Sequence, residues 1–439
     1  MTQSVQRLLE KHSSEYDNIS VHISLSKSKS VQLDGTAIES VDYSDSASTI
    51  VRCVKDGKML TYALTGTDED SLKAFFAGAA KAISYLPSDV NRFIPSYSLP
   101  EKSADYFDKN FDDISMEMLT TKAVEVTETA LENDKRVKSV KQSSVAASKS
   151  TSVIISTAGP VLKAEKTVFS AGAYLIAEDN GEERDGYDYV SSVKMKGLDY
   201  KTSAKTAAMN ACSLLGARQI KSGKYHIVFS ASVMADFIEL LLDLTDGENV
   251  FKGVSLLGGK KGQKIASEGF YLTDNPLVPD GIASRAFDDE GQPCLPLEII
   301  SAGVLNTYLH NSYTAKALDE ENNARAVLTD GGYTAVGCTN ISLKSTTKEK
   351  PGKFANEYLF ITEVMGMHTA DPVSGDFSVG IAGIYYKDEN NAFPFKEAVI
   401  SGNLTHLLEG MIHTFDNRRT FGNITTADTL FDKMSVSGV

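Results

Sequence analysis

The pattern of apolar and polar positions near the C-terminus predicts three consecutive β-strands, over residues 358–364, 377–387 and 392–400. Alternating and β-branched residues mark these strands. Short polar turns join them, at 371–376 and 388–391. Turns of this length leave no room for a crossover helix, which needs a dozen or more residues, so the strands are predicted to form an antiparallel meander. A helix over 404–415 is predicted to follow. Gly380 and Gly383 lie inside the second strand, which indicates a bulge or the close approach of another backbone.

The first 220 residues show the order helix, strands, helix twice. Apolar residues at helical spacing predict helices over 2–13 and about 199–215, and further helices beginning near 67 and 115. Between them, period-two patterns predict strands over 19–27, 30–33, 37–43, 49–55, 58–64, 137–145, 152–156, 162–178 and 188–194. The repeated order suggests a structural repeat.

We therefore predict an α+β fold, in which an N-terminal region of helices and antiparallel sheet precedes a β-rich, antiparallel C-terminal domain. A chain of 439 residues is too long for one small core. The predicted domains are an N-terminal α+β domain over 1–105, a central α+β domain over 106–219 and the C-terminal domain over 220–439.

Charge and composition narrow the function classes. The net charge of −14 and the absence of any Lys/Arg run longer than two argue against a nucleic-acid-binding surface. No apolar run approaches the roughly 18 residues that a membrane helix needs, and the N-terminus lacks the apolar core of a secretory signal. The cysteines are too widely spaced for a zinc knuckle or a disulfide framework, namely Cys53, Cys212, Cys294 and Cys338. We expect free thiols in a cytoplasmic protein that binds neither membrane nor nucleic acid.

Three groups of side chains are candidates for chemistry. Glu239 and Asp243 lie one turn apart on a predicted helix over 232–244. There they would bind a cation, or form the solvent-exposed side of a surface helix. Asp288, Asp289 and Glu290 form an acidic turn that ends in glycine. Such a turn suits a cation or a peptide amine, or it is a tight turn that uses Asp and Gly for their backbone preferences.

The third group is His406, Glu409 and His413, which would share one face of the helix predicted over 404–415. There they would converge on a metal, in a spacing that matches neither H-E-x-x-H nor H-x-x-E-H, or form the solvent-facing side of that helix.

Several stretches carry a family resemblance. They are TEVMG at 362–366, SGDFSVGIAG at 374–383, FPFKEAVISGNL at 393–404, GIASRAFDDEGQP at 281–293 and KYHIVFSASVMADFIELLL at 224–242. Together they resemble the TldD/PmbA family, also called modulators of DNA gyrase. The first 200 residues carry fewer of its motifs. The chain is more similar to the PmbA (TldE) branch than to the TldD branch.

The resemblance implies a role in peptide hydrolysis. The family's catalytic branch consists of zinc metallopeptidases, in which an H-E-x-x-x-H helix and a Cys near the C-terminus hold the metal. Here the matching helix, 232–244, contains no His, and no Cys follows Cys338. The resemblance therefore implies that this chain has no catalytic residues of its own and no cofactor, and that zinc belongs to a TldD-like partner subunit.

The implied function is that of a PmbA/TldE-like subunit of a metallopeptidase that degrades or processes small or unfolded peptides. This chain would form the cavity and bind the substrate, at Gly380 and Gly383 or at Asp288, Asp289 and Glu290. Two alternatives stay open: a stand-alone enzyme with an unorthodox metal site, and a non-catalytic homodimer that binds peptides. The expected partners are a TldD-like zinc peptidase or a second copy of the chain, and a peptide.

Overall fold

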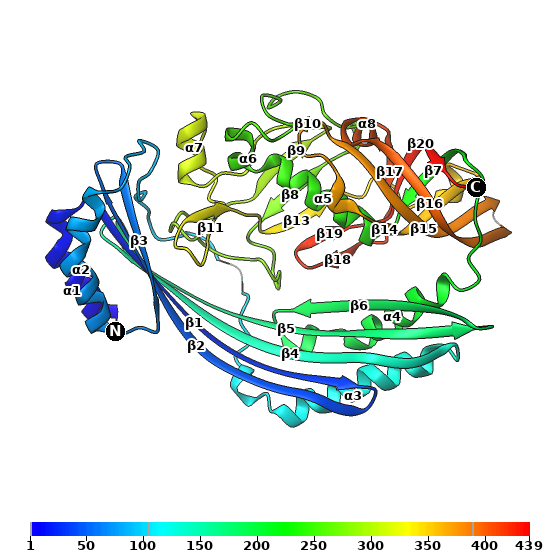
Figure 1. Ribbon diagram of the computed structural model, residues 1–439, viewed down its shortest axis with the longest axis horizontal. Coiled ribbons are helices and arrows are strands. Elements are labelled where there is room, and N and C mark those ends of the chain that lie inside the picture. The colour runs from blue at the N-terminus through cyan, green and yellow to red at the C-terminus, as the bar shows by residue number, and fades with distance from the viewer. Residues whose placement is uncertain (1, 104, 389) are drawn as a thin grey trace.

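The order helix, three strands, helix occurs twice before residue 214, as the repeat in the sequence suggested. The computed structural model describes residues 2–103, 105–388 and 390–439 (Figure 1). Met1, Ala104 and Glu389, the last within the predicted turn at 388–391, lie outside the described residues. The first unit comprises α1 (Thr2–His12), β1 (Asn18–Asp34), β2 (Ala37–Lys55), β3 (Lys58–Thr65) and α2 (Glu69–Ser84). The second comprises α3 (Met116–Asn133), β4 (Val137–Ser156), β5 (Gly159–Asp179), β6 (Glu182–Ser192) and α4 (Tyr200–Ser213).

The strands of both units form one antiparallel sheet, in the order β3-β2-β1-β4-β5-β6. Val21 on β1 pairs with Val51 of its own unit and with Ile155 of the other. The sheet therefore crosses the boundary predicted at residue 105, and the division into domains there stays a prediction.

Several predicted strands are shorter than the real ones. The segments 19–27 and 30–33 are one strand, β1, and 37–43 and 49–55 are one strand, β2. The intervening segments are rich in serine and charge, yet they remain extended because a neighbouring strand pairs with them, as Lys27 does with Asp45 on one side and Lys149 on the other.

Helices cover the convex side of this long sheet at both ends (Figure 1). Val5, Leu9, Phe76 and Ile83 of α1 and α2 are buried in one apolar cluster against the sheet. Ala-rich faces of α3 and α4 are buried in a second cluster with β1, β4 and β5. The concave side carries no helix of these two units and faces the C-terminal elements.

A closed ring of five strands forms one part of the C-terminal region. Each strand pairs with the next in the order β16-β15-β14-β7-β20, and β16 pairs back with β20. The members are β7 (Gly223–Phe229), β14 (Tyr358–Met365), β15 (Asp376–Asp388), β16 (Asn391–Asn403) and β20 (Thr429–Ser437). The predicted meander is confirmed as β14, β15 and β16, while β7 pairs with β14 in parallel.

A second sheet lies beside the ring, in the order β10-β9-β8-β13-β19-β18. Its strands are β8 (Leu272–Asn275), β9 (Leu297–Ser301), β10 (Val304–Leu305), β13 (Asn340–Leu343), β18 (Arg419–Phe421) and β19 (Ile424–Thr426). The remaining strands are β11 (Ala326–Leu328), β12 (Thr334–Val336) and β17 (Met411–Thr414), and the remaining short helices are α6 (Gly247–Phe251) and α7 (Ser312–Leu318). Isolated 3-10 turns lie at Ser13–Glu15, Phe111–Asp113, Met195–Gly197, Pro351–Lys353 and Met367–Thr369. Among the described residues, no helix is both long and apolar enough to cross a membrane.

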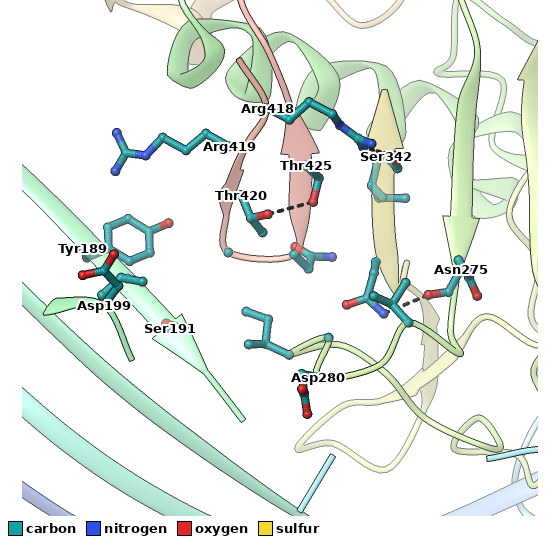
Figure 2. A pocket seen from close by; sticks show the side chains of 18 of the residues that line it. Tyr189, Ser191, Asp199, Asn275, Asp280, Ser342, Arg418, Arg419, Thr420 and Thr425 are labelled. Carbon is teal, nitrogen blue, oxygen red and sulfur yellow. Dashed lines mark hydrogen bonds between the residues drawn. The ribbon is translucent and has the colours of Figure 1, made fainter. Parts of the chain in front are cut away.

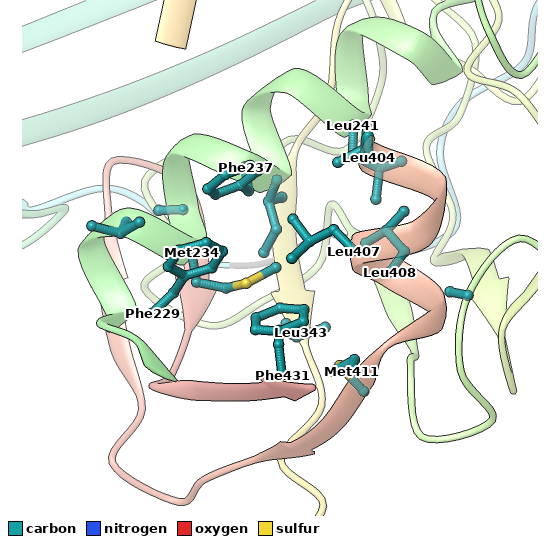
Figure 3. Packing of buried hydrophobic residues seen from close by; sticks show 14 of the residues in the cluster. Phe229, Met234, Phe237, Leu241, Leu343, Leu404, Leu407, Leu408, Met411 and Phe431 are labelled. Carbon is teal, nitrogen blue, oxygen red and sulfur yellow. The ribbon is translucent and has the colours of Figure 1, made fainter. Parts of the chain in front are cut away.

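Helix α5 (Ala231–Thr245) packs at the centre of the C-terminal core. Ser230 caps it by accepting from the Val233 N–H. Its apolar side, with Phe237 and Leu241, lies against the Leu404 and Leu407 side of α8 (Leu404–Glu409) and against Phe431 of β20 (Figure 3). Burial of this side leaves the polar side of α5 facing outward.

Candidate functional site

A cavity of about 800 Å³ lies between the long sheet and the C-terminal region (Figure 2). One wall is β6 with the first turn of α4, and the other consists of β8, β13 and the β18–β19 hairpin. Its volume lies within the usual range of small-ligand pockets. Most of the side chains that line it are hydroxyls, amides and charged groups, so the cavity suits a polar ligand.

Two strands at the cavity wall have one side without a strand partner. β6 is the last strand of the long sheet and β18 is the last strand of the second sheet. Local turns place both: Asn180 and Gly181, with φ of 50° and 82°, close the β5–β6 hairpin, and Gly422, with φ of 56°, begins the two-residue β18–β19 turn. Since residues 188–191 of β6 line the cavity, main-chain groups as well as side chains are available to a ligand.

An ion pair links the two walls. Arg419 on β18 contacts Asp188 on β6, with Nη2 at 2.5 Å from each carboxylate oxygen. The neighbouring Arg418 donates to the Ser342 hydroxyl on β13 at 2.5 Å. Arg418 makes no ion pair with any residue that the structure describes.

The outward side of α5 carries Asp236, Glu239 and Asp243, which are exposed. Partial desolvation raises the pKa of Asp236 to about 6, and the nearby Glu239 adds to the rise. Desolvation raises the pKa of Glu239, and the negative charge of Asp243 raises it further. Desolvation also raises the pKa of Asp243. Burial also raises the pKa of Tyr189 in the cavity wall, with Glu239 as the next cause. This acidic side of α5 therefore acts electrostatically on the cavity.

The predicted acidic turn is built into the protein by hydrogen bonds. Asp288 is fully buried and accepts from the backbone N–H groups of Glu290, Gln292 and Ala326 at 2.9, 2.9 and 3.1 Å. Burial and the nearby Glu290 raise the pKa of Asp288, while Arg285 and the backbone donors oppose this.

The other two carboxylates of this turn are occupied in the same way. Asp289 accepts from the Leu328 N–H at 2.8 Å, and Glu290 accepts from the Ser312 N–H and the Thr334 hydroxyl, both at 2.8 Å. These contacts favour the tight-turn interpretation of the segment. Substrate contact by these three residues stays a prediction.

Gly380 and Gly383 lie on β15, between β14 and β16. Both sides of β15 are paired, so no peptide can add to it as a neighbouring strand at these positions. A Cβ on Gly383 would lie 2.0 Å from the Phe360 carbonyl oxygen, beside the bulge between Ile361 and Glu363. The backbone that approaches Gly383 is thus the protein's own. Substrate contact at the two glycines stays a prediction.

The helix predicted over 404–415 is wrong beyond residue 409. α8 ends at Glu409, and the chain turns at Gly410 into β17. His406 and Glu409 are exposed on α8, whereas His413 is on the strand, with its ring centroid 4.2 Å from that of Phe354. The convergence of His406, Glu409 and His413 on a metal is therefore wrong, because it required one continuous helical face.

Sequence reasoning missed the cavity residues Asp188, Tyr189, Arg418 and Arg419. The two adjacent arginines were a usable signal, since no Lys/Arg run is longer in this acidic chain. The ion pair between Asp188 on β6 and Arg419 on β18, more than 200 residues apart, had no signature in the sequence. Helix α7 was also missed, although Asn311 and Thr314 form a capping box at its start.

The second unit and the C-terminal region match known metallopeptidase domains. Residues 109–215 match the PmbA/TldA metallopeptidase central domain, and residues 222–438 match the PmbA/TldA metallopeptidase C-terminal domain. The chain belongs to the PmbA/TldD family of metallopeptidases. Within that family it is a PmbA-like member, as the resemblance in the sequence predicted.

Individual relatives are distant but cover most of the chain. The metalloprotease PmbA homolog of Buchnera aphidicola is 27% identical over 328 residues, which span 74% of this chain and 70% of the relative. A candidate modulator of a DNA gyrase from Thermotoga maritima has the same fold, with a TM-score of 0.90, 23% identity and 99% coverage of both chains. TldE from Thermococcus kodakarensis also has this fold, with a TM-score of 0.89, 18% identity and coverage of 99% of this chain and 100% of that one.

Proposed function

We propose that this chain is the substrate-binding, zinc-free subunit of a two-component metallopeptidase that degrades small or unfolded peptides. The cavity between the unpaired sides of β6 and β18 carries the proposal. A peptide in extended conformation can hydrogen-bond to such a strand through its main chain, whatever its side chains. Binding of this kind suits a protein whose substrates differ in sequence.

The zinc half of the proposal rests on the donor atoms that α5 offers. The family's catalytic helix supplies two imidazoles and a Glu, whereas the outward side of α5 carries only carboxylates, on Asp236, Glu239 and Asp243. These residues do not fit the family's zinc ligand set. Hydrolysis of an unactivated amide needs a strong nucleophile and stabilisation of the oxyanion, so we assign both to a TldD-like partner that holds zinc.

The direct test is a peptide-cleavage assay with three samples: this chain, a TldD-like partner, and both together. We expect cleavage at the full rate only in the mixture. Elemental analysis should find no stoichiometric zinc in this chain. Chelator-sensitive cleavage by this chain alone would instead favour a stand-alone enzyme. Full activity of the partner alone, together with a stable homodimer of this chain, would favour the non-catalytic peptide-binding alternative.

The cavity itself is tested by filling it. Thr202 lies on α4 at the cavity wall, and Thr121 is an exposed threonine on α3, whose helix covers the convex side of the sheet. We expect Thr202→Tyr to lower cleavage by the mixture and Thr121→Tyr to leave it unchanged. Equal activity of both variants would remove the cavity from the proposal.

We also propose a cytoplasmic location. The four cysteines are free thiols, and three of them are buried, which agrees with a reducing compartment. Fractionation of the native host with a periplasmic or secreted marker tests this, and recovery with that marker would contradict it.

A further inference from the structure

The two adjacent arginines of the cavity differ in what they contact. Arg419 is neutralised by Asp188. Arg418 is exposed, lines the same cavity, and has only the uncharged Ser342 hydroxyl as a hydrogen-bond partner among the described residues. A guanidinium group has five N–H donors, so most of the donors of Arg418 are available to a ligand.

The carboxylates that line the cavity are each engaged elsewhere. Asp188 pairs with Arg419, and Asp280 pairs with Lys194 at 3.0 Å. Asp199 caps α4 by accepting from the Thr202 N–H at 3.2 Å. Arg418 is therefore the one charged lining group, within the described part of the chain, that has neither a charged partner nor a capping role.

The surroundings of Arg418 add further hydrogen-bonding groups to its guanidinium. Ser342 holds the guanidinium near β13, and Asn275 and Thr425 add an amide and a hydroxyl to the same wall (Figure 2). Arg418 directly precedes β18, but its side chain reaches across β19 to Ser342 on β13, on the far side of β19 from the unpaired edge of β18 (Figure 2). The free donors of this guanidinium therefore favour a ligand group that carries a negative charge.

We infer that Arg418 binds the free C-terminal carboxylate of a peptide held in this cavity. The planar guanidinium fork matches a carboxylate with two parallel hydrogen bonds, and the Ser342 hydroxyl is placed to add a third. The inference rests on the proposed peptide-binding function and narrows its substrates. Peptides with a free C-terminus bind there, whereas amidated ends and internal segments of long chains bind more weakly.

The test compares one short, N-terminally labelled peptide as the free acid and as the C-terminal amide. Fluorescence anisotropy measures the affinity of each for the full chain in complex with its TldD-like partner. We expect the acid to bind about tenfold more tightly than the amide, the effect of one charge-assisted hydrogen bond. Arg418→Gln should remove this preference without changing binding of the amide, and Arg418→Lys should restore part of it.

Arg7→Gln is the matched control, because Arg7 is an exposed arginine on α1 that does not line this cavity. Equal affinities of acid and amide for the wild-type complex would overturn the inference and leave the proposed function standing. A loss of the preference in Arg7→Gln, or displacement of both peptides by acetate alone, would also overturn it. If neither peptide binds, the proposed function fails together with the inference.

Discussion

Arg419 and Asp188 connect two sheets that are more than 200 residues apart in the chain. The pair crosses from β18 to β6 at the cavity wall, with Nη2 of Arg419 at 2.5 Å from both carboxylate oxygens. The Asp188 side chain is 7% exposed, whereas that of Arg419 is 37% exposed. The carboxylate has therefore lost most of its water and depends on the arginine for compensation.

We predict that Arg419→Met destabilises the protein by about 2 kcal/mol. Loss of one partner from a fully buried pair costs more, but solvent can partly reach Asp188 once the arginine is removed. Urea unfolding measures the change. Arg418→Gln at the adjacent position breaks no ion pair and should change the free energy of unfolding by less than half as much. A similar loss of stability in both variants would mean that the ion pair with Asp188 is not the cause.

A larger effect is expected at Arg325 and Asp274, whose side chains are both 0% exposed. Arg325 Nε lies 2.6 Å from Asp274, which also accepts from the Thr339 N–H at 3.0 Å. Arg325→Met would leave a buried, unpaired carboxylate, at a cost of about 3–5 kcal/mol. The double variant Arg325→Met with Asp274→Leu removes both charges and should recover part of that loss. Additive effects in the thermodynamic cycle would mean that the two side chains do not interact.

The two glycines of β15 should respond differently to alanine. A Cβ at Gly383 would lie 2.0 Å from the Phe360 carbonyl oxygen, whereas at Gly380 the nearest atom is the Met365 Cε at 3.4 Å. Gly383→Ala forces backbone atoms apart, and we expect it to lower the melting temperature by about 2 °C, the effect of about 2 kcal/mol in a chain of this length. Gly380→Ala should be nearly neutral. If Gly380→Ala folds normally but weakens peptide binding, Gly380 gains support as a substrate contact.

Stability should fall as the pH rises through the acid range because of Asp236. Its folded-state pKa of about 6 lies above the unfolded value of 3.8, so the folded protein binds more protons between these values. The free energy of unfolding then decreases from pH 4 to pH 6. Asp236→Asn should raise the melting temperature at pH 7 and leave it unchanged at pH 4.

Glu239→Gln separates the two causes of that pKa shift. Since the negative charge of Glu239 adds to the rise, its removal should lower the titration midpoint of Asp236 measured by NMR. An unchanged midpoint would leave desolvation as the whole cause.

Much of the fold followed from local patterns in the sequence. The meander of β14, β15 and β16 was predictable because its turns are too short for any other connection. Helix α5 was predictable from apolar spacing that begins after Ser230. The serine-rich middle of β1 was not, because partner strands rather than its own side chains keep it extended.

The helix predicted over 404–415 failed for a related reason. Apolar residues continue past Gly410, but Met411 and Thr414 are used to pair β17 with β20. Short-range periodicity does not distinguish a helix that continues from a chain that turns into a strand, since tertiary pairing decides between them.

The sequence by itself determined the family and the residue types available at each place, including the absence of histidine from α5. Those properties depend on residue identity alone. Tertiary structure decided which residues share a site. In the folded protein, His413 lies on a strand and His406 on a helix, and the carboxylates of 288–290 accept hydrogen bonds within the protein. Arg418 and Arg419 line the same cavity as β6. Contacts between segments hundreds of residues apart arise from the packing of whole sheets, and no local pattern in the chain encodes them.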